Sequence, residues 1–342
     1  MANGEPVLWS LYVYAPNKIA PAVFAVLYGA STVGHIWQCY LYKCFHLLGL
    51  HPLCGALFTL GYALREYGSF NYLYEEENTT VLITFVLSQV FIYICPPLLE
   101  LANYHVLGRL FYYVPHQAPL PASRVLSIFG ALMLIVETLN GIGVSLASNP
   151  SGKPTTQELG SHLTIAALSM QFAVIIIFVV LAGLFHFRCA KAGIRTHAVI
   201  VPLRTLYTSM VLILIRCIYR LIEHMGSTTV DIDNMEALRA LTPVLRYEWF
   251  FYVFEATLMF LNSSLWNVWN PGRYLPRSYL VYLGRDGTTE IEGVAVVDER
   301  SFGQKVAAVA TLGICFRREK TERNWKPDLM DVFPGRKIVN VT

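Results

Sequence analysis

The sequence predicts an all-α polytopic membrane protein with seven transmembrane helices, its N-terminus outside and its C-terminus in the cytosol. Of its 342 residues, 55% are hydrophobic and only 14% are charged, whereas roughly a quarter of the residues of a soluble domain are charged. The apolar residues gather in stretches of about 20, the length that a helix needs to cross a bilayer. The formal net charge of +3 gives no indication of nucleic-acid binding.

Seven such stretches follow one another along the chain. The clearest is the fifth, which contains the uncharged run SMQFAVIIIFVVLAGLFHF, whereas Pro96 and Pro97 interrupt the third. Proline is tolerated inside a spanning helix where neighbouring groups satisfy the freed carbonyl oxygens, so we expect a kink there and not an end. The expected spans are residues 18–42, 47–67, 80–101, 124–147, 161–187, 203–225 and 243–269.

Basic residues between the spans predict the orientation. Alternate loops hold basic residues, namely Lys43, then Arg109 and Arg124, then several arginines and lysines between residues 188 and 204. Of the other loops, two are acidic and one holds a lone Lys153. Cytoplasmic loops of membrane proteins are enriched in Lys and Arg, so the N-terminus is expected outside. The chain then divides into an outer N-terminal segment (1–17), a seven-helix domain (18–272) and a cytosolic tail (273–342), with a turn at residues 285–287 between two short β-like runs.

One glycosylation sequon agrees with this orientation. Asn78-Thr79-Thr80 has the acceptor pattern and falls in an expected outer loop. Acidic outer loops, one of them glycosylatable, favour the plasma membrane, although the endoplasmic reticulum or another endomembrane would present the same topology. Residues 1–17 lack the basic start of a cleavable signal peptide, so the first span is expected to act as its own insertion signal.

Ionisable side chains inside the expected spans indicate where a functional site lies, because charges in a bilayer are costly and usually face the bundle interior. Arg216, Arg220 and Glu223 in the sixth span share one helical face, as do Glu248 and Glu255 in the seventh. Counting 1.5 Å per residue brings polar groups from five helices to overlapping depths. We call this set the polar cluster, and it contains Arg65, Glu137, Asn140, Gln171, Arg216, Tyr219, Arg220, Glu223, Glu248, Tyr252 and Glu255.

The polar cluster has two interpretations. Its members could form one site that opens toward the outer leaflet. Alternatively, Arg220 with Glu223 or Glu248 could be a buried clamp between the sixth and seventh helices, while Asn140 and Gln171 make interhelical hydrogen bonds.

Three segments of the chain resemble a known family. GYALREYG (61–68), IRCIYRLIEHMG (215–226) and RYEWFFYVFEATLMF (246–260), with PGR after the last span, are similar to the RTA-like proteins of fungi, also called the lipid-translocating exporter family. The resemblance covers nearly all of residues 10–280. It implies a seven-helix protein with an outer N-terminus that exports or flips sphingoid long-chain bases, or confers resistance to toxic amphiphiles; one branch is linked to porphyrin uptake.

The chain departs from this family's pattern at several positions. Where the family's fourth span usually carries an Asp and a Gln, this chain has Met133 and Asn140, with Glu137 one turn after Met133. Glu255 stands where the family usually has an Asp, and the closing His-Pro-Gly reads as residues 270–272, Asn-Pro-Gly. These changes could move an acidic site or alter the substrate.

The expected function is therefore transport or flippase-like translocation of amphiphilic lipids such as sphingoid bases. Glu137, Glu248 and Glu255 would accept the ammonium and hydroxyl head, while Arg216 and Arg220 keep the empty site near neutral. The expected partners are membrane lipids and an amphiphilic small molecule. Movement of the lipid would be driven uphill by proton exchange, or it would follow the lipid's own concentration gradient, as in a scramblase.

Two other functional classes remain open. A seven-helix lipid-sensing receptor or stress-response membrane protein fits the expected topology. An intramembrane lipid hydrolase would need a metal site, and the nine histidines contain no H-x-x-x-H pair. We therefore expect no enzymatic activity, no cofactor and no metal.

Overall fold

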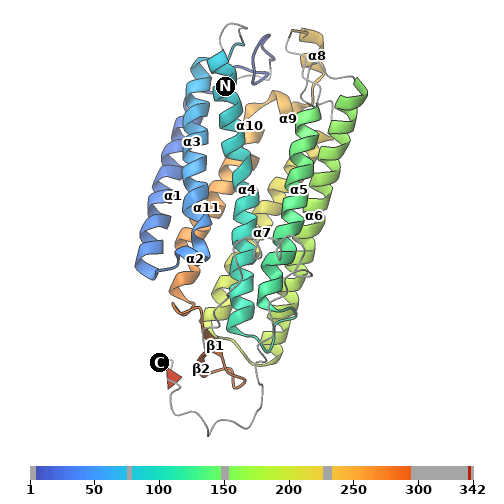
Figure 1. Ribbon diagram of the computed structural model, residues 1–342. Helices are drawn as coiled ribbons and strands as arrows, with labels where there is room; N and C mark the ends of the chain where they lie inside the picture. The colour runs from blue at the N-terminus through green and yellow to red at the C-terminus, as the bar shows by residue number, and fades with distance from the viewer. Residues whose placement is uncertain (1–4, 75–78, 148–153, 226–232, 294–337, 340–342) are drawn as a thin grey trace, which may run out of the picture.

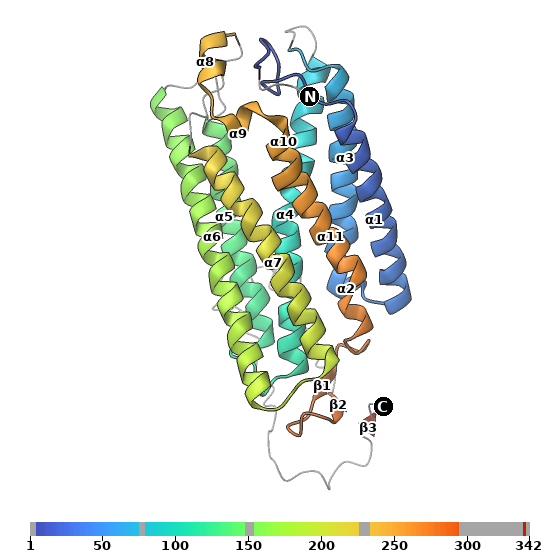
Figure 2. The same ribbon diagram turned by 180° about the vertical axis from the view of Figure 1, so that it is seen from behind.

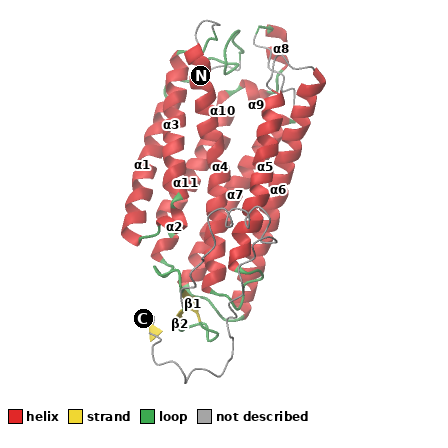
Figure 3. Cartoon of the chain, in the orientation of Figure 1, coloured by secondary structure: helices red, strands yellow, loops and turns green. Residues whose placement is uncertain are grey.

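Long helices run side by side in an elongated bundle, seen in the computed structural model (Figures 1 and 3). The structure describes residues 5–74, 79–147, 154–225, 233–293 and 338–339. Within this part of the chain, five helices are long and apolar enough to cross a membrane. They are α1 (Ala20–Tyr42), α4 (Thr79–Tyr113), α5 (Ala122–Ala147), α6 (Pro154–Lys191) and α7 (His197–His224). This is the architecture of an all-α polytopic membrane protein.

Two further helical segments pack in the same bundle without meeting these criteria of length and apolarity. α3 (Leu50–Phe70) lies between α1 and α4. The last segment consists of α10 (Glu248–Phe251), the π-helix η1 (Tyr252–Thr257) and α11 (Leu258–Val268), and it packs against α7 and α1. If both segments also cross the membrane, the number of spans is seven, which stays a prediction.

The helix expected over residues 243–269 is interrupted, which corrects the sequence prediction. The short helix α9 (Pro243–Arg246) ends at Tyr247, whose φ of −104° and ψ of 111° are extended. A π-helix then follows α10, and the Thr257 hydroxyl donates a hydrogen bond to the Tyr252 carbonyl oxygen. Because a π-helical turn holds more residues than an α-helical turn, side chains beyond it are rotated away from their α-helical positions.

Several helices extend past the expected spans. α4 continues through Pro96 and Pro97 to Tyr113, so these prolines do not end the helix, as predicted. Its 35 residues correspond to a length of about 52 Å, more than the roughly 30 Å of a hydrocarbon core. The expected spans stopped where the apolar residues became sparse, but hydrogen bonding within a helix can continue outside the membrane.

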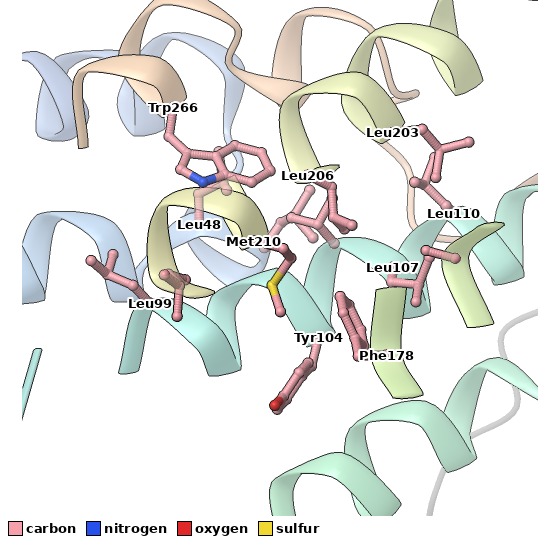
Figure 4. Close-up of a cluster of buried hydrophobic side chains, with 14 of the residues drawn as sticks. Leu48, Leu99, Tyr104, Leu107, Leu110, Phe178, Leu203, Leu206, Met210 and Trp266 are labelled. Carbon is pink, nitrogen blue, oxygen red and sulfur yellow. The ribbon is translucent and has the colours of Figure 1, made fainter. Parts of the chain in front are cut away.

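The inside of the bundle is packed with large apolar side chains. Trp266 of α11, Met210 of α7 and Tyr104 of α4 are fully buried, and Met210 lies between the other two (Figure 4). The outside is apolar as well, since Val26, Trp37 and Phe187 are 72%, 71% and 67% exposed. Such a surface is unfavourable in water and is suited to contact with lipid.

Small elements cover the two ends of the bundle. At one end, β1 (Val281–Leu283) and β2 (Glu290–Glu292) form the predicted antiparallel pair, and β3 (Ile338–Val339) extends it. Gly287 in their turn has a φ of +73°, which glycine adopts without strain. The guanidinium of Arg109 in α4 donates hydrogen bonds to the carbonyl oxygens of Pro276, Ser278 and Val281, which attaches this region to the bundle. The remaining short elements are α2 (Phe45–Leu48), α8 (Met235–Ala240) and η2 (Pro271–Arg273).

The N-terminal segment lies at the opposite end of the bundle, near α8 (Figures 1 and 2). Tyr12, Val13 and Tyr14 are 6–7% exposed, and Ser10 forms an isolated β-bridge with Leu73. This segment therefore folds onto the bundle and is part of the packed structure.

Candidate functional site

Arg65 of α3 contacts two other members of the predicted polar cluster, Glu248 and Tyr252, at the end of the bundle nearer the N-terminal segment. The side chain is buried, and its guanidinium donates hydrogen bonds to Glu248 Oε1 at 3.5 Å and to the Tyr252 hydroxyl at 3.4 Å. The same group lies 4.1 Å from the ring centroid of Phe251. An ion pair, a hydrogen bond and an aromatic ring together replace the water that this buried cation has lost.

The N-terminal segment completes the surroundings of Arg65. The Tyr14 hydroxyl accepts a hydrogen bond from the guanidinium at 3.1 Å, and the Asn17 backbone N–H donates to Glu248 Oε2 at 2.8 Å. Burial raises the pKa of the Tyr14 hydroxyl above its usual value, although the nearby Arg65 charge opposes the shift. The sequence analysis missed Tyr14, although the aromatic residues between Trp9 and Tyr14 were a visible sign that this segment packs.

Arg216 and Glu255 form the buried ion pair that joins α7 to η1. Arg216 Nε lies 2.8 Å from Glu255 Oε1 and 2.9 Å from Oε2, and the two side chains are 5% and 0% exposed. The sequence offered Arg220 with Glu223 or Glu248 as the clamp between these helices. The structure places the interhelical pair at Arg216 and Glu255 instead, with Glu255 inside the π-helix η1.

The predicted pairing of Arg220 with Glu223 is confirmed, but both residues belong to α7, so the pair cannot clamp two helices. The Arg220 guanidinium also lies 4.3 Å from the ring centroid of Tyr93 in α4. Tyr219, another predicted member, stacks on Phe254 with ring centroids 5.5 Å apart. Its contribution here is aromatic packing between α7 and η1.

Glu100 of α4 belongs to the polar cluster and was missed by the sequence analysis. It is 1% exposed and accepts hydrogen bonds from the Tyr104 hydroxyl and from Gln171 Nε2, the latter at 3.0 Å. Glu137 of α5, which is hydrogen-bonded to Asn140, lies within electrostatic range of Glu100. The third span was expected to end at residue 101, where a charge is ordinary. Because α4 continues to Tyr113, Glu100 lies well inside the helix.

With Glu100, the polar cluster draws its side chains from six helical segments, namely α3, α4, α5, α6, α7 and the segment from α10 to η1. Tyr93 lies within electrostatic range of Arg65, Arg220, Glu223 and Glu255, and Glu137 lies within range of Arg216. With Glu100 included, three arginines share the cluster with five glutamates. If all are ionised, the acids exceed the bases by two. The five acids are Glu100, Glu137, Glu223, Glu248 and Glu255.

Two positions from the sequence analysis lie apart from these contacts. Met133, which stands where the family usually has an Asp, is partly buried and packs against the apolar core. Asn78, the expected glycosylation site, lies outside the described residues.

Comparisons with known proteins agree with the resemblance noted in the sequence. The family model described as RTA1 like protein matches residues 53–278, which include the whole polar cluster. The chain is 51% identical over 326 residues to a protein of Leptosphaeria maculans named "Lipid-translocating exporter-like protein RTA1", covering 94% of this chain and 62% of the relative. The chain thus spans less than two thirds of that relative's length.

More distant relatives come from other fungi. A protein of Emericella nidulans named "Probable lipid transporter atnI" is 26% identical over 284 residues, which cover 78% of this chain and 68% of the relative. "Protein RTA1" of Saccharomyces cerevisiae is 25% identical over 285 residues, covering 74% and 82%. No solved structure matches the chain. From the family match and the identity to the Leptosphaeria protein, this chain belongs to the RTA1-like protein family.

Proposed function

We propose that this protein translocates cationic amphiphiles, such as sphingoid long-chain bases, across a membrane and that the polar cluster binds their head group. Relatives whose names refer to lipid translocation or lipid transport make lipids the first class of substrate to consider. The identity of the head group must come from the chemistry of the cluster itself.

The observation that carries this proposal is the acidic excess of the polar cluster. Glu248, Glu255 and Glu223 each have an arginine partner, whereas Glu100 and Glu137 have only neutral hydrogen-bond partners among the described residues. A buried carboxylate is stabilised by a nearby cation, and an ammonium group would supply one. The apolar tail of the same molecule could remain in contact with lipid.

The proposal includes the orientation expected from the loops. α3 and the segment from α10 to α11 would be the two additional spans, giving seven, with the N-terminal segment outside and β1 and β2 in the cytosol. The polar cluster then lies in the outer half and near the middle of the membrane. Residence in the plasma membrane and glycosylation of Asn78 belong to the same proposal.

The test measures transbilayer movement of a fluorescent sphingoid base in proteoliposomes. Glu100→Gln and Glu137→Gln remove the excess acids without leaving any arginine unpaired, so both variants should keep their fold. We expect wild-type protein to speed movement above that of empty liposomes, and each variant to need about tenfold more base for the same rate, because one ionic contact is lost.

The matched control is Glu158→Gln, because Glu158 on α6 is highly exposed and pairs with the equally exposed His162. It should behave as wild type. Wild-type protein that does not speed movement above empty liposomes would contradict the proposal. If such protein still bound the base tightly, a lipid-sensing receptor would be the better interpretation.

A further inference from the structure

The last helical segment carries a buried polar side chain at every seventh position. Glu248, Glu255 and Asn262 are 8%, 0% and 0% exposed. Seven residues of helix make about two turns and a rise of about 10 Å. Since α10, η1 and α11 run lengthwise through the bundle (Figure 2), the three side chains lie at successive depths.

The third of these side chains differs from the first two. Glu248 is bonded to Arg65, and Glu255 to Arg216. Asn262 is fully buried, yet neither its Oδ1 nor its Nδ2 has a hydrogen-bond partner among the described residues. Folded proteins keep few such groups, because a buried polar atom without a partner destabilises the fold.

A second unpartnered group lies in the same part of the bundle. His51, at the start of α3, is 1% exposed, and neither ring nitrogen has a hydrogen-bond partner among the described residues. Its ring centroid is 5.3 Å from that of His35 and 5.3 Å from that of Trp266, one turn after Asn262. His35 Nε2 is 3.1 Å from the hydroxyl oxygen of Ser263, the residue next to Asn262.

The chemistry of these groups selects a ligand. An amide offers both a donor and an acceptor, and so does a neutral imidazole. Neither brings the carboxylate that an ammonium would need or the fixed cation that a phosphate would need. A hydroxyl group, which donates and accepts at once, matches both.

We propose that Asn262 and His51 form a subsite that binds a hydroxyl group of the amphiphile as its head leaves the polar cluster and moves along α11. This inference rests on the proposed function. It adds that the charged and the uncharged parts of one head group bind at different depths of the bundle. The polar cluster binds the ammonium, and the subsite selects for lipids that also carry a hydroxyl.

The test compares two fluorescent amines in proteoliposomes, a hydroxylated long-chain base and a plain long-chain alkylamine. Asn262→Leu and His51→Phe each replace the unpartnered polar side chain with an apolar one of similar shape. We expect each variant to slow the hydroxylated base at least about fivefold and to leave the alkylamine within about twofold of wild type. The Tm should stay the same or rise, because an unpaired buried polar group has been removed.

Asn103→Leu is the contrasting variant, because Asn103 is buried and bonded to Ser209. Its Tm should fall, which shows that the measurement detects the loss of a partnered amide. A fall in Tm for Asn262→Leu, or equal slowing of both amines, would overturn the subsite and leave Asn262 a packing residue.

The two proposals fail in different ways. If wild type moves both amines and both subsite variants move the hydroxylated base at the wild-type rate, the subsite is wrong while translocation stands. A pair of side chains that holds only water would give that result. If wild type moves neither amine, the proposed function fails, and the subsite falls with it.

Discussion

Buried polar groups have different partners in the two halves of the bundle. Toward the N-terminal segment, the buried Arg65 and Arg216 and the partly buried Arg220 each have a carboxylate partner. Toward the strands, the guanidinium of Arg109 is buried and donates hydrogen bonds to backbone carbonyl oxygens.

The neutral buried groups toward the strands include His51 and Asn262, which have no hydrogen-bond partner among the described residues. An isolated buried charge costs far more than an isolated amide or hydroxyl, so a neutral group is tolerated more easily without a partner. The Tyr62 hydroxyl, near Arg65, is another buried group without a hydrogen-bond partner among the described residues.

The largest effect should come from breaking the pair between Arg216 and Glu255. Arg216→Met leaves a wholly buried carboxylate without its cation and should lower the free energy of unfolding by about 3–5 kcal/mol. The double variant Arg216→Met with Glu255→Leu should recover most of this loss. Chemical unfolding in detergent micelles measures the free energy of unfolding of both variants.

Arg204→Met on the same helix is the control, because Arg204 is exposed and should tolerate the change. A double variant as unstable as Arg216→Met would show that the pair does more than neutralise charge. Charge pairing would then not be what distinguishes the half of the bundle toward the N-terminal segment.

A smaller effect is expected from Ser209→Ala, in the half of the bundle toward the strands. The Ser209 hydroxyl oxygen accepts hydrogen bonds from Asn103 Nδ2 at 2.9 Å and from Trp266 Nε1 at 3.1 Å. Both donors would be left buried without that partner, so the free energy of unfolding should fall by about 1–3 kcal/mol. Ser169→Ala on an exposed face of α6 should change it by less than about 0.5 kcal/mol. Equal losses at the two serines would mean that the neutral network contributes little.

The smallest effect should follow Glu223→Gln. Glu223 pairs with Arg220 inside one helix, and a glutamine can still accept a hydrogen bond from the guanidinium. The free energy of unfolding should fall by about 1 kcal/mol or less. A loss above about 2 kcal/mol would indicate that Glu223 also supports the Arg216 and Glu255 pair, joining the two ion pairs in one network.

Spacing along one helix predicted what happens within that helix. The pairing of Arg220 with Glu223 followed from three residues of separation, whereas the depth of Arg216 in the membrane stays a prediction. The partner of Arg216 could not be predicted in this way. A contact between helices depends on how each is rotated, and the π-helix that contains Glu255 has no clear sign in the apolar pattern.

Helix ends were the other source of error. Glu100 escaped notice because the apolar run ends beside it, although the helix does not. The break at Tyr247 was missed for the opposite reason, since apolar and aromatic residues continue across it. Hydrophobicity reports where a chain can meet lipid, whereas the ends of a helix are decided by its backbone hydrogen bonds.

Both carboxylate oxygens of Glu248 are already engaged, one by Arg65 and the other by the backbone N–H of Asn17. Each of these oxygens can accept a second hydrogen bond, so an incoming donor can share Glu248 with the two partners or replace one of them. Where it replaces a partner, the strength of binding equals the difference between two similar hydrogen bonds, which is small. Weak exchange of this kind suits a place through which a molecule passes quickly better than a place where it is stored.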